Sequence, residues 1–430
     1  MSKQQPLLAL LPLGVFLVIF LGTGLYLHLT GAEMAFYQLP APVAALAGII
    51  VGMLVLKGSL NHKLEVLVKG IGDSNIIIMC LVFILAGAFA TVAKAMGGVE
   101  ATVNFGISII PTSLLLPGIF LISAFISTAM GTSMGTIAAI TPIAIGIADK
   151  AGLGLAIAVG AVIGGAMFGD NLSMISDTTI AATRTQGAEM KDKFKMNFFI
   201  ALPAAILTVI FLAIFSSGTG TLDGHYPYTI IKVIPYLLVL GLALIGMNVF
   251  AVLTIGIITA GIIGLAGGEI GSLLHFGQLI YEGFTGMQEI FLLSFLTGGL
   301  AELNRHYGGL DYLLNFVGSR IKSKKGAEFG LAGLISVADI ATANNTVAIV
   351  LAGPIAKDLA EKHGVSPKRA ASILDIFSCV WQGLIPYGAQ ILLAGSLAGL
   401  SPFAIIPTLW YQFILAIITL VAIAVNFPKE

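Results

Sequence analysis

Two aspartates seven positions apart stand in a nearly uncharged part of this sequence. The stretch FGDNLSMISDTTIAA (168–182) contains Asp170 and Asp177, and apolar sequence from Leu153 to Phe168 precedes them. A carboxylate in hydrocarbon is costly unless a cation or a proton neutralises it. Hard cations such as Na⁺ bind oxygens of carboxylates, hydroxyls, amide side chains and freed backbone carbonyls. These residue types therefore suit reversible binding of a cation or a proton.

Oxygen-bearing side chains also gather in two short segments, STAMGTSMGT (127–136) and ADIATANNT (338–346). Their candidate ligands are Ser127, Thr128, Thr132, Ser133, Asn344, Asn345 and Thr346. A third segment, VWQGLIPYGAQI (380–391), combines Pro386 with two glycines. Proline removes a backbone donor and glycine adds freedom, so we expect an interrupted helix there. The same segment can line a pocket for an organic solute through Trp381, Gln382, Tyr387 and Gln390.

The composition places the chain in a lipid bilayer. Of 430 residues, 57% are hydrophobic and 10% are charged, with a mean hydropathy of +1.02, whereas soluble domains carry roughly 25% charged residues. Several apolar runs approach the roughly 20 residues that span a bilayer as a helix. These runs are 7–27, 41–56, 75–96, 198–215, 231–250 and 402–425.

Several functional classes are excluded by the same sequence. The net charge is zero, so no nucleic-acid partner is indicated, and Cys80 and Cys379 lie in apolar runs without the spacing of a metal site. No P-loop, HExxH or GxSxG motif is present. We therefore expect no enzyme activity and no cofactor.

Two pairs of segments recur at nearly the same distance along the chain. LAGAFATVAKAMGGVEATVNF (85–105) resembles LTGGLAELNRHYGGLDYLLNF (296–316), at an offset of 211. PIAIGIADKAG (142–152) resembles PIAKDLAEKHG (354–364), at an offset of 212. Two matches at almost one offset predict structural repeats, at 70–180 and 281–391.

The basic residues predict the orientation of these repeats, because Lys and Arg collect on cytoplasmic loops. Segment 97–113 contains no Lys or Arg, whereas the equivalent segment 305–325 contains five. One repeat is therefore expected to face outward where the other faces inward. Inverted repeats with interrupted helices are the architecture of secondary transporters. The main alternative class is an ion channel, although channels usually repeat by subunit symmetry around a pore.

If the basic loops all lie on the cytoplasmic side, two segments must begin and end on the same side of the membrane. We predict an all-α polytopic membrane protein, residues 1–430 as one integral domain, with about ten transmembrane helices plus two re-entrant hairpins and both termini in the cytoplasm. The hairpins are expected at 113–148 and 328–360, and helices broken at the midplane at 155–180 and 370–400. Ordinary spans in place of hairpins would put the basic loop 362–369 outside.

Five acids are expected at membrane depth: Asp170, Asp177, Glu289, Asp339 and Asp375. We expect no Lys or Arg at that depth, because the basic residues fall in predicted loops, and Lys193 is one of these. Salt bridges are therefore disfavoured, and bound Na⁺ or protons remain. For Asp375, a position at the membrane interface is an equally good explanation. For Glu289, a position at a helix N-terminus is equally good.

GAMFGDNLSMISDTTIAATRTQGAE (165–189) resembles the NhaC-type sodium/proton antiporter family of the ion transporter superfamily. ATANNTVAIVLAGPIAKD and SILDIFSCVWQGLIPYGAQ resemble second-half motifs of that family. The resemblance covers roughly 70–400. It implies Na⁺/H⁺ antiport by alternating, elevator-like access, often in a homodimer, in the cell inner membrane.

The residues and the resemblance together give two sets of candidate site residues. The predicted ion-binding residues are Asp170, Asn171, Ser173, Ser176, Asp177, Thr178, Asn344, Asn345 and Thr346, with Na⁺ at Asp170, Asp177 and Asn345. The predicted substrate-binding residues are Ser127, Thr132, Ser133, Asp339, Trp381, Gln382, Tyr387 and Gln390. The second set suits the alternative function, Na⁺-coupled symport of an amino acid or another small organic solute.

We predict that Asp177→Ala inserts normally in the membrane yet loses Na⁺-dependent transport, because it removes one of the two acids expected to bind the cation. Flux into proteoliposomes measures this, and wild-type rates in the variant would remove Asp177 from the site.

Overall fold

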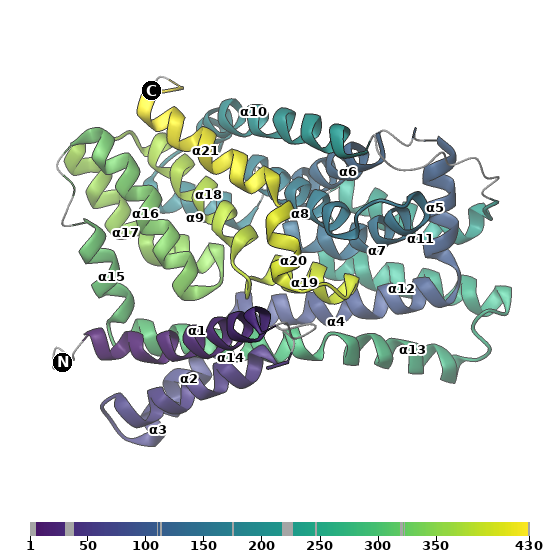
Figure 1. The fold of residues 1–430 in the computed structure, drawn as a ribbon, viewed down its shortest axis with the longest axis horizontal. Coiled ribbons are helices and arrows are strands. Elements are labelled where there is room, and N and C mark those ends of the chain that lie inside the picture. The colour runs from purple at the N-terminus through teal and green to yellow at the C-terminus, as the bar shows by residue number, and fades with distance from the viewer. Residues whose placement is uncertain are drawn as a thin grey trace.

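The computed structural model describes residues 6–30, 38–109, 111, 114–173, 176–216, 227–245, 247–318, 321 and 323–428, which form helices and connections without a strand (Figure 1). The helices are α1 (Pro6–Leu29), α2 (Ala41–Val55), α3 (Leu60–Ile71), α4 (Ser74–Ala95), α5 (Gly98–Ile109), α6 (Leu115–Met130), α7 (Ser133–Ala151), α8 (Leu155–Leu172), α9 (Asp177–Gln186), α10 (Met190–Ser216), α11 (Ile230–Leu244), α12 (Val249–Gly267), α13 (Leu273–Gly286), α14 (Gln288–His306), α15 (Gly309–Gly318), α16 (Lys324–Thr342), α17 (Asn345–His363), α18 (Pro367–Leu384), α19 (Ala389–Ala398), α20 (Pro402–Ile405) and α21 (Trp410–Val425), with a 3₁₀ turn at Ile406–Thr408.

The number of membrane-spanning helices differs from the prediction. Within the described residues, seven helices are long and apolar enough to cross a membrane, or eight if the pair 402–408 and 410–425, bent by 52°, forms one span. The multi-pass helical class is confirmed, but ten spans are not. Some apolar runs form helices too short to qualify: α2 has 15 residues and α6 has 16. At 1.5 Å per residue these reach about 22 to 24 Å, less than the roughly 30 Å hydrocarbon core.

Four interruptions divide the helices where the sequence places special residues. α6 ends before Gly131 and α7 begins at Ser133, while α16 ends before Ala343 and α17 begins at Asn345, 212 positions after Ser133. α8 is followed by α9 from Asp177, and α18 by α19 from Ala389, again 212 positions later. The predicted interruptions are therefore present. Whether 113–148 and 328–360 are re-entrant stays a prediction.

Local chemistry explains why the helices stop at these points. Gly131 has φ 69° and Ala343 has φ 53°, so each helix ends in a left-handed residue. Two of the helices that follow an interruption are capped by side chains. At α17, Asn344 Oδ1 accepts a bond of 3.0 Å from Val347 N, and at α9, Ser176 Oγ accepts one of 3.2 Å from Thr179 N.

Two hydrophobic cores lie on either side of the interruptions. The first is built mainly from α4–α8 and α10–α13, and the second mainly from α1–α3 and α14–α17. In Figure 1, α5–α7 and α11–α13 lie toward the right and α15–α17 toward the left. The short helices that follow the interruptions of α8 and α18 are α9 and α19. α9 packs in the second core through Ala181 and Ala182, and α19 packs in the first through Ile391 and Leu393.

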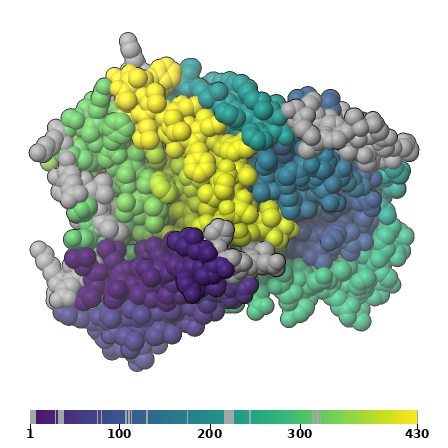
Figure 2. Space-filling model, viewed as in Figure 1, coloured from purple at the N-terminus to yellow at the C-terminus, as the bar shows by residue number. Residues whose placement is uncertain are grey.

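Small residues bring α8 against α6 and so position the end of α8. A Cβ atom on Gly169 would lie 2.5 Å from Thr128 N and 2.6 Å from Ala124 O. A Cβ on Gly165 would lie 2.8 Å from Ser123 Cβ. Because no larger side chain fits at these two glycines, the backbone that carries the next residue, Asp170, is held directly against α6. On the face in Figure 2, the C-terminal segment, drawn in yellow, lies between the green second half and the blue-green first half.

The left-handed residues at the two helix–helix turns predict opposite effects of exchanging Gly and Ala. Ala343→Gly relieves a conformation that costs a non-glycine residue about 1 kcal/mol, partly offset by the greater freedom of the unfolded chain. Gly131→Ala introduces that cost at the equivalent turn. We expect the apparent melting temperature of detergent-solubilised protein to rise slightly for Ala343→Gly and to fall for Gly131→Ala. Shifts in the same direction would contradict this explanation of the turns.

Candidate functional site

A cavity of about 460 Å³ lies where the four interruptions meet. Its polar lining comes from the ends of α7, α8, α9, α17, α18 and α19. The predicted site residues that line it are Thr132, Ser133, Asp170, Asp177, Thr178, Asn344, Asn345, Thr346, Gln382 and Gln390. The remaining wall includes Ile78 and Val82 of α4 and the α11–α12 connection around Asn248. No motif in the sequence predicts these residues as part of the site.

Asp170, in the last turn of α8, is the buried acid of this cavity, with 5% of its surface exposed. Its Oδ2 accepts a hydrogen bond of 3.0 Å from Ser133 Oγ, and its Oδ1 accepts one of 3.5 Å from Thr178 Oγ1. Among the described residues, no basic side chain forms an ion pair with it. Two neutral hydroxyls therefore hold its carboxylate.

A chain of side-chain hydrogen bonds joins Asp170 to the second half of the protein. Ser133 Oγ accepts from Gln390 Nε2 at 3.1 Å, and Gln390 Oε1 accepts from Gln382 Nε2 at 2.9 Å. Gln382 Nε2 also donates to the carbonyl of Ala343 at 3.2 Å. The interruptions at α6–α7, α8–α9, α16–α17 and α18–α19 are thus linked through one polar network.

Asp177 and the asparagine pair line other parts of the same cavity. Asp177 begins α9, and its side chain is exposed. Asn344 caps α17, and Asn345 Oδ1 accepts a bond of 3.0 Å from Thr346 N. Asp177 therefore lines the cavity from the start of α9, with more of its surface exposed than Asp170 has.

Seven other predicted residues are not among those that line the cavity. Ser127 donates to Ala166 O at 2.5 Å and so packs α6 on α8, and Asn171 Nδ2 donates to Met167 O at 3.1 Å. Tyr387 donates to Ile340 O at 2.7 Å. Asp339 is fully buried near the backbone of Gln382, but neither of its oxygens accepts a hydrogen bond of ordinary geometry from a described residue. The remaining residues of this group are Trp381, Ser173 and Ser176, of which Ser176 caps α9.

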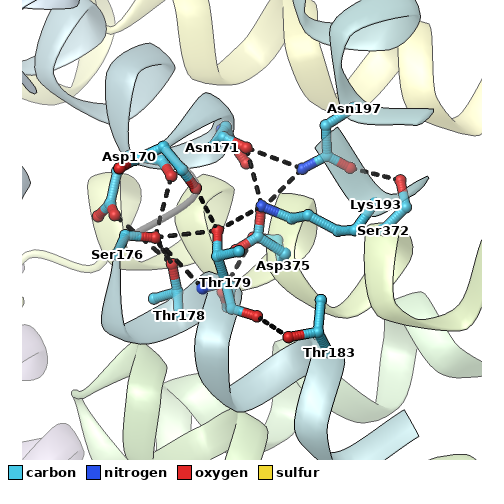
Figure 3. A network of polar contacts seen from close by, with 12 residues as sticks. Asp170, Asn171, Ser176, Thr178, Thr179, Thr183, Lys193, Asn197, Ser372 and Asp375 are labelled. Atoms are coloured by element: carbon cyan, nitrogen blue, oxygen red, sulfur yellow. Dashed lines mark hydrogen bonds and ion pairs between the residues drawn. The ribbon is translucent and has the colours of Figure 1, made fainter. Parts of the chain in front are cut away.

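A buried lysine corrects the expectation that no basic side chain accompanies the acids. Lys193 Nζ lies 2.7 Å from Asp375 Oδ2, and both side chains are 0% exposed. Lys193 belongs to the first turn of α10, not to a loop, and points inward beside Asn171 and Thr179 (Figure 3). Asn197, four residues later on the same helix face, also bonds Asp375 Oδ2, at 2.8 Å. This Lys–Asn spacing of four was the sequence signal that could have suggested a buried polar face.

These features together define a multi-pass helical membrane protein with a polar, carboxylate-bearing cavity between interrupted helices. The model of the Na⁺/H⁺ antiporter family matches residues 6–217 and 223–427, so the chain belongs to that family. The predicted family is confirmed.

Individual relatives are similar over most of their length. The Na(+)/H(+) antiporter NhaC of Bacillus subtilis is 28% identical, over 84% of this chain and 85% of its own. The malate-2H(+)/Na(+)-lactate antiporter of the same organism is 24% identical, over 91% and 90%. The YdaH transporter of Alcanivorax borkumensis has a solved structure that covers 96% of this chain and 99% of its own, with 14% identity and a TM-score of 0.45.

Removing the Ser133 hydroxyl tests whether the bond to Asp170 contributes to a cation site. A hydrogen bond to a charged group contributes about 1.5 kcal/mol or more, so we expect Ser133→Ala to raise the Na⁺ concentration for half-maximal thermal stabilisation about tenfold. The matched control is Thr136→Val, one turn along α7, because the Thr136 hydroxyl bonds only Thr132 O of its own helix. Equal Na⁺ responses in both variants would exclude Ser133 from the site.

Proposed function

We propose that this protein exchanges Na⁺ for H⁺ across the membrane, with Asp170 as the group that binds both in turn. Family membership supports the antiport reaction. The observation that carries the site is the placement of Asp170, which is 95% buried and faces a cavity but is held only by hydroxyls.

The transported Na⁺ is proposed to bind oxygens that already converge on the cavity. The Asp170 carboxylate supplies the negative charge, and Ser133 and Thr178 supply hydroxyl oxygens. Asn345 and Thr346 line the opposite wall and contribute amide and hydroxyl oxygens. The exposed Asp177 attracts cations at the cavity mouth, in addition to the ligand role expected from the sequence. Hard cations favour such oxygen sets.

Competition for one carboxylate explains how the two ions are coupled. A buried carboxylate without a cation takes up a proton, whereas a nearby Na⁺ favours the ionised form. Binding Na⁺ at Asp170 therefore releases a proton, and protonation releases Na⁺. When the cavity opens alternately to the two sides of the membrane, this competition couples Na⁺ movement in one direction to H⁺ movement in the other.

The architecture proposed for alternating access consists of inverted repeats at 70–180 and 281–391, with re-entrant hairpins at 113–148 and 328–360. The 212-residue spacing of helix starts supports the repeat. The equivalent helices α5 and α15 lie toward opposite ends of the molecule in Figure 1, which supports inversion. α1 begins and α21 ends on the same side of that view, which supports placing both termini in the cytoplasm. We further propose elevator-like movement, a homodimer and the cell inner membrane.

The alternative, Na⁺-coupled symport of an organic solute, is not favoured by the family match. Its proposed ligands divide between two environments: Gln382 and Gln390 line the cavity, but Trp381 and Tyr387 are not among the lining residues. The experiment that follows separates symport and channel activity from antiport.

We expect an imposed Na⁺ gradient to move protons in the opposite direction across proteoliposomes that contain the wild-type protein, followed with a trapped pH-sensitive dye. Asp170→Asn should abolish this movement because it preserves side-chain volume but removes the charge. Glu189→Gln, a change at an exposed acid, serves as the matched control and should keep wild-type rates.

Three outcomes would contradict the proposal. Wild-type rates in Asp170→Asn would exclude that residue. A Na⁺ gradient that drives a labelled amino acid but moves no protons would indicate symport. Ion flux far above roughly 10³ per second, the upper end of ordinary turnover, would indicate a channel.

A further inference from the structure

Lys193 is an unusual residue because its charge lies fully inside the protein. Its side chain is 0% exposed, and its ammonium group lies within 3 Å of three oxygens from different parts of the chain (Figure 3). These are Asn171 O at 2.9 Å, Thr179 Oγ1 at 2.6 Å and Asp375 Oδ2 at 2.7 Å. Burying a lysine is costly, so a specific set of partners must stabilise it.

The three oxygens are of the kinds that bind a metal cation. They are a backbone carbonyl, a hydroxyl and a carboxylate, and the carbonyl belongs to the last turn of α8. The C-terminus of a helix carries partial negative charge and attracts cations. Freed carbonyls at interrupted helices coordinate Na⁺ in membrane transporters. In chemical terms, the Lys193 ammonium occupies a small cation site.

This site lies on the other side of the α8–α9 interruption from the cavity. Asp170 faces the cavity, whereas its neighbour Asn171 directs its carbonyl to Lys193. Both sides share a hydroxyl network, because Ser176 Oγ donates to Thr179 Oγ1 at 3.0 Å and to Asp170 O at 3.3 Å. The charges of Asp375 and Lys193 both act electrostatically on Asp170.

Counting charges around the interruption gives the number of external cations that it requires. Of the buried charged groups at the interruption, Asp170 and Asp375 are negative and Lys193 is positive; the exposed Asp177 is not counted. Because Lys193 pairs directly with Asp375, one negative charge, that of Asp170, remains to be neutralised from outside.

We propose that the oxygens of Asn171, Thr179 and Asp375 form a second cation site in which Lys193 replaces Na⁺, so that the interruption binds one external Na⁺ instead of two. This inference rests on the proposed Na⁺ site at Asp170. Lys193 acts as a positioning residue: it holds the end of α8 and the start of α9 together and leaves Asp170 as the exchangeable site. Removing its side chain opens the second site to an external cation.

Thermal stabilisation by Na⁺ tests the proposal, because binding to the folded state raises its stability. We expect Asp170→Asn to lose the Na⁺-dependent rise in melting temperature. Lys193→Ala/Asp170→Asn should regain it, because the vacated oxygens then bind Na⁺. Adding Asp375→Asn to this double variant should remove the response again. Lys195→Ala/Asp170→Asn, which changes an exposed lysine of the same helix, is the matched control and should show no response.

The outcomes distinguish this proposal from the one on which it rests. An unchanged Na⁺ response in Asp170→Asn overturns the Na⁺ site at Asp170. Loss of the response in Asp170→Asn without its return in Lys193→Ala/Asp170→Asn overturns the second site and leaves the first intact. Should the double variant be poorly folded, its yield of monodisperse protein is compared in NaCl and choline chloride. A higher yield in NaCl supports the second site, and equal yields overturn it.

Discussion

The whole arrangement depends on one constraint: a carboxylate at the broken end of a membrane helix must be neutralised without a permanent basic partner. Asp170 meets that constraint through hydroxyl donors from two other helices, Ser133 of α7 and Thr178 of α9. These hydroxyls stabilise the carboxylate but add no charge. A mobile cation or proton is therefore the remaining source of neutrality, which connects the geometry of the interruption with the antiporter family of the chain.

The two buried acids at the α8–α9 interruption, Asp170 and Asp375, have opposite surroundings. Asp375 is bound permanently by Lys193 and Asn197, whereas Asp170 faces a cavity. Two adjacent residues of α8 divide these roles: Asp170 directs its side chain to the cavity, and Asn171 directs its backbone carbonyl to the lysine. The buried pair behind the helix end therefore connects the last turn of α8 with α18.

Much of this could be predicted from the sequence, and the remainder has identifiable physical causes. Glycine, proline and asparagine act locally, so the interruptions at Gly131 and near Pro386 were predictable, as was the convergence of Asp170 with Ser133. The inward direction of Lys193 was not, because the packing of α10 on α8, α18 and α21 decides which face of its first turn is buried. Nor could hydropathy fix the number of spans, since it does not determine where a helix such as α6 ends.

The crossover of the short segments α9 and α19 has a mechanical consequence. α8 packs in the first core and continues as α9 in the second, while α18 leads back to α19 in the first. The chain therefore passes between the two cores at both interruptions, beside the cavity, as it also does at α3–α4, α9–α10 and α13–α14. Any displacement of one core relative to the other must therefore change the backbone at these two interruptions, which are also the segments that line the cavity.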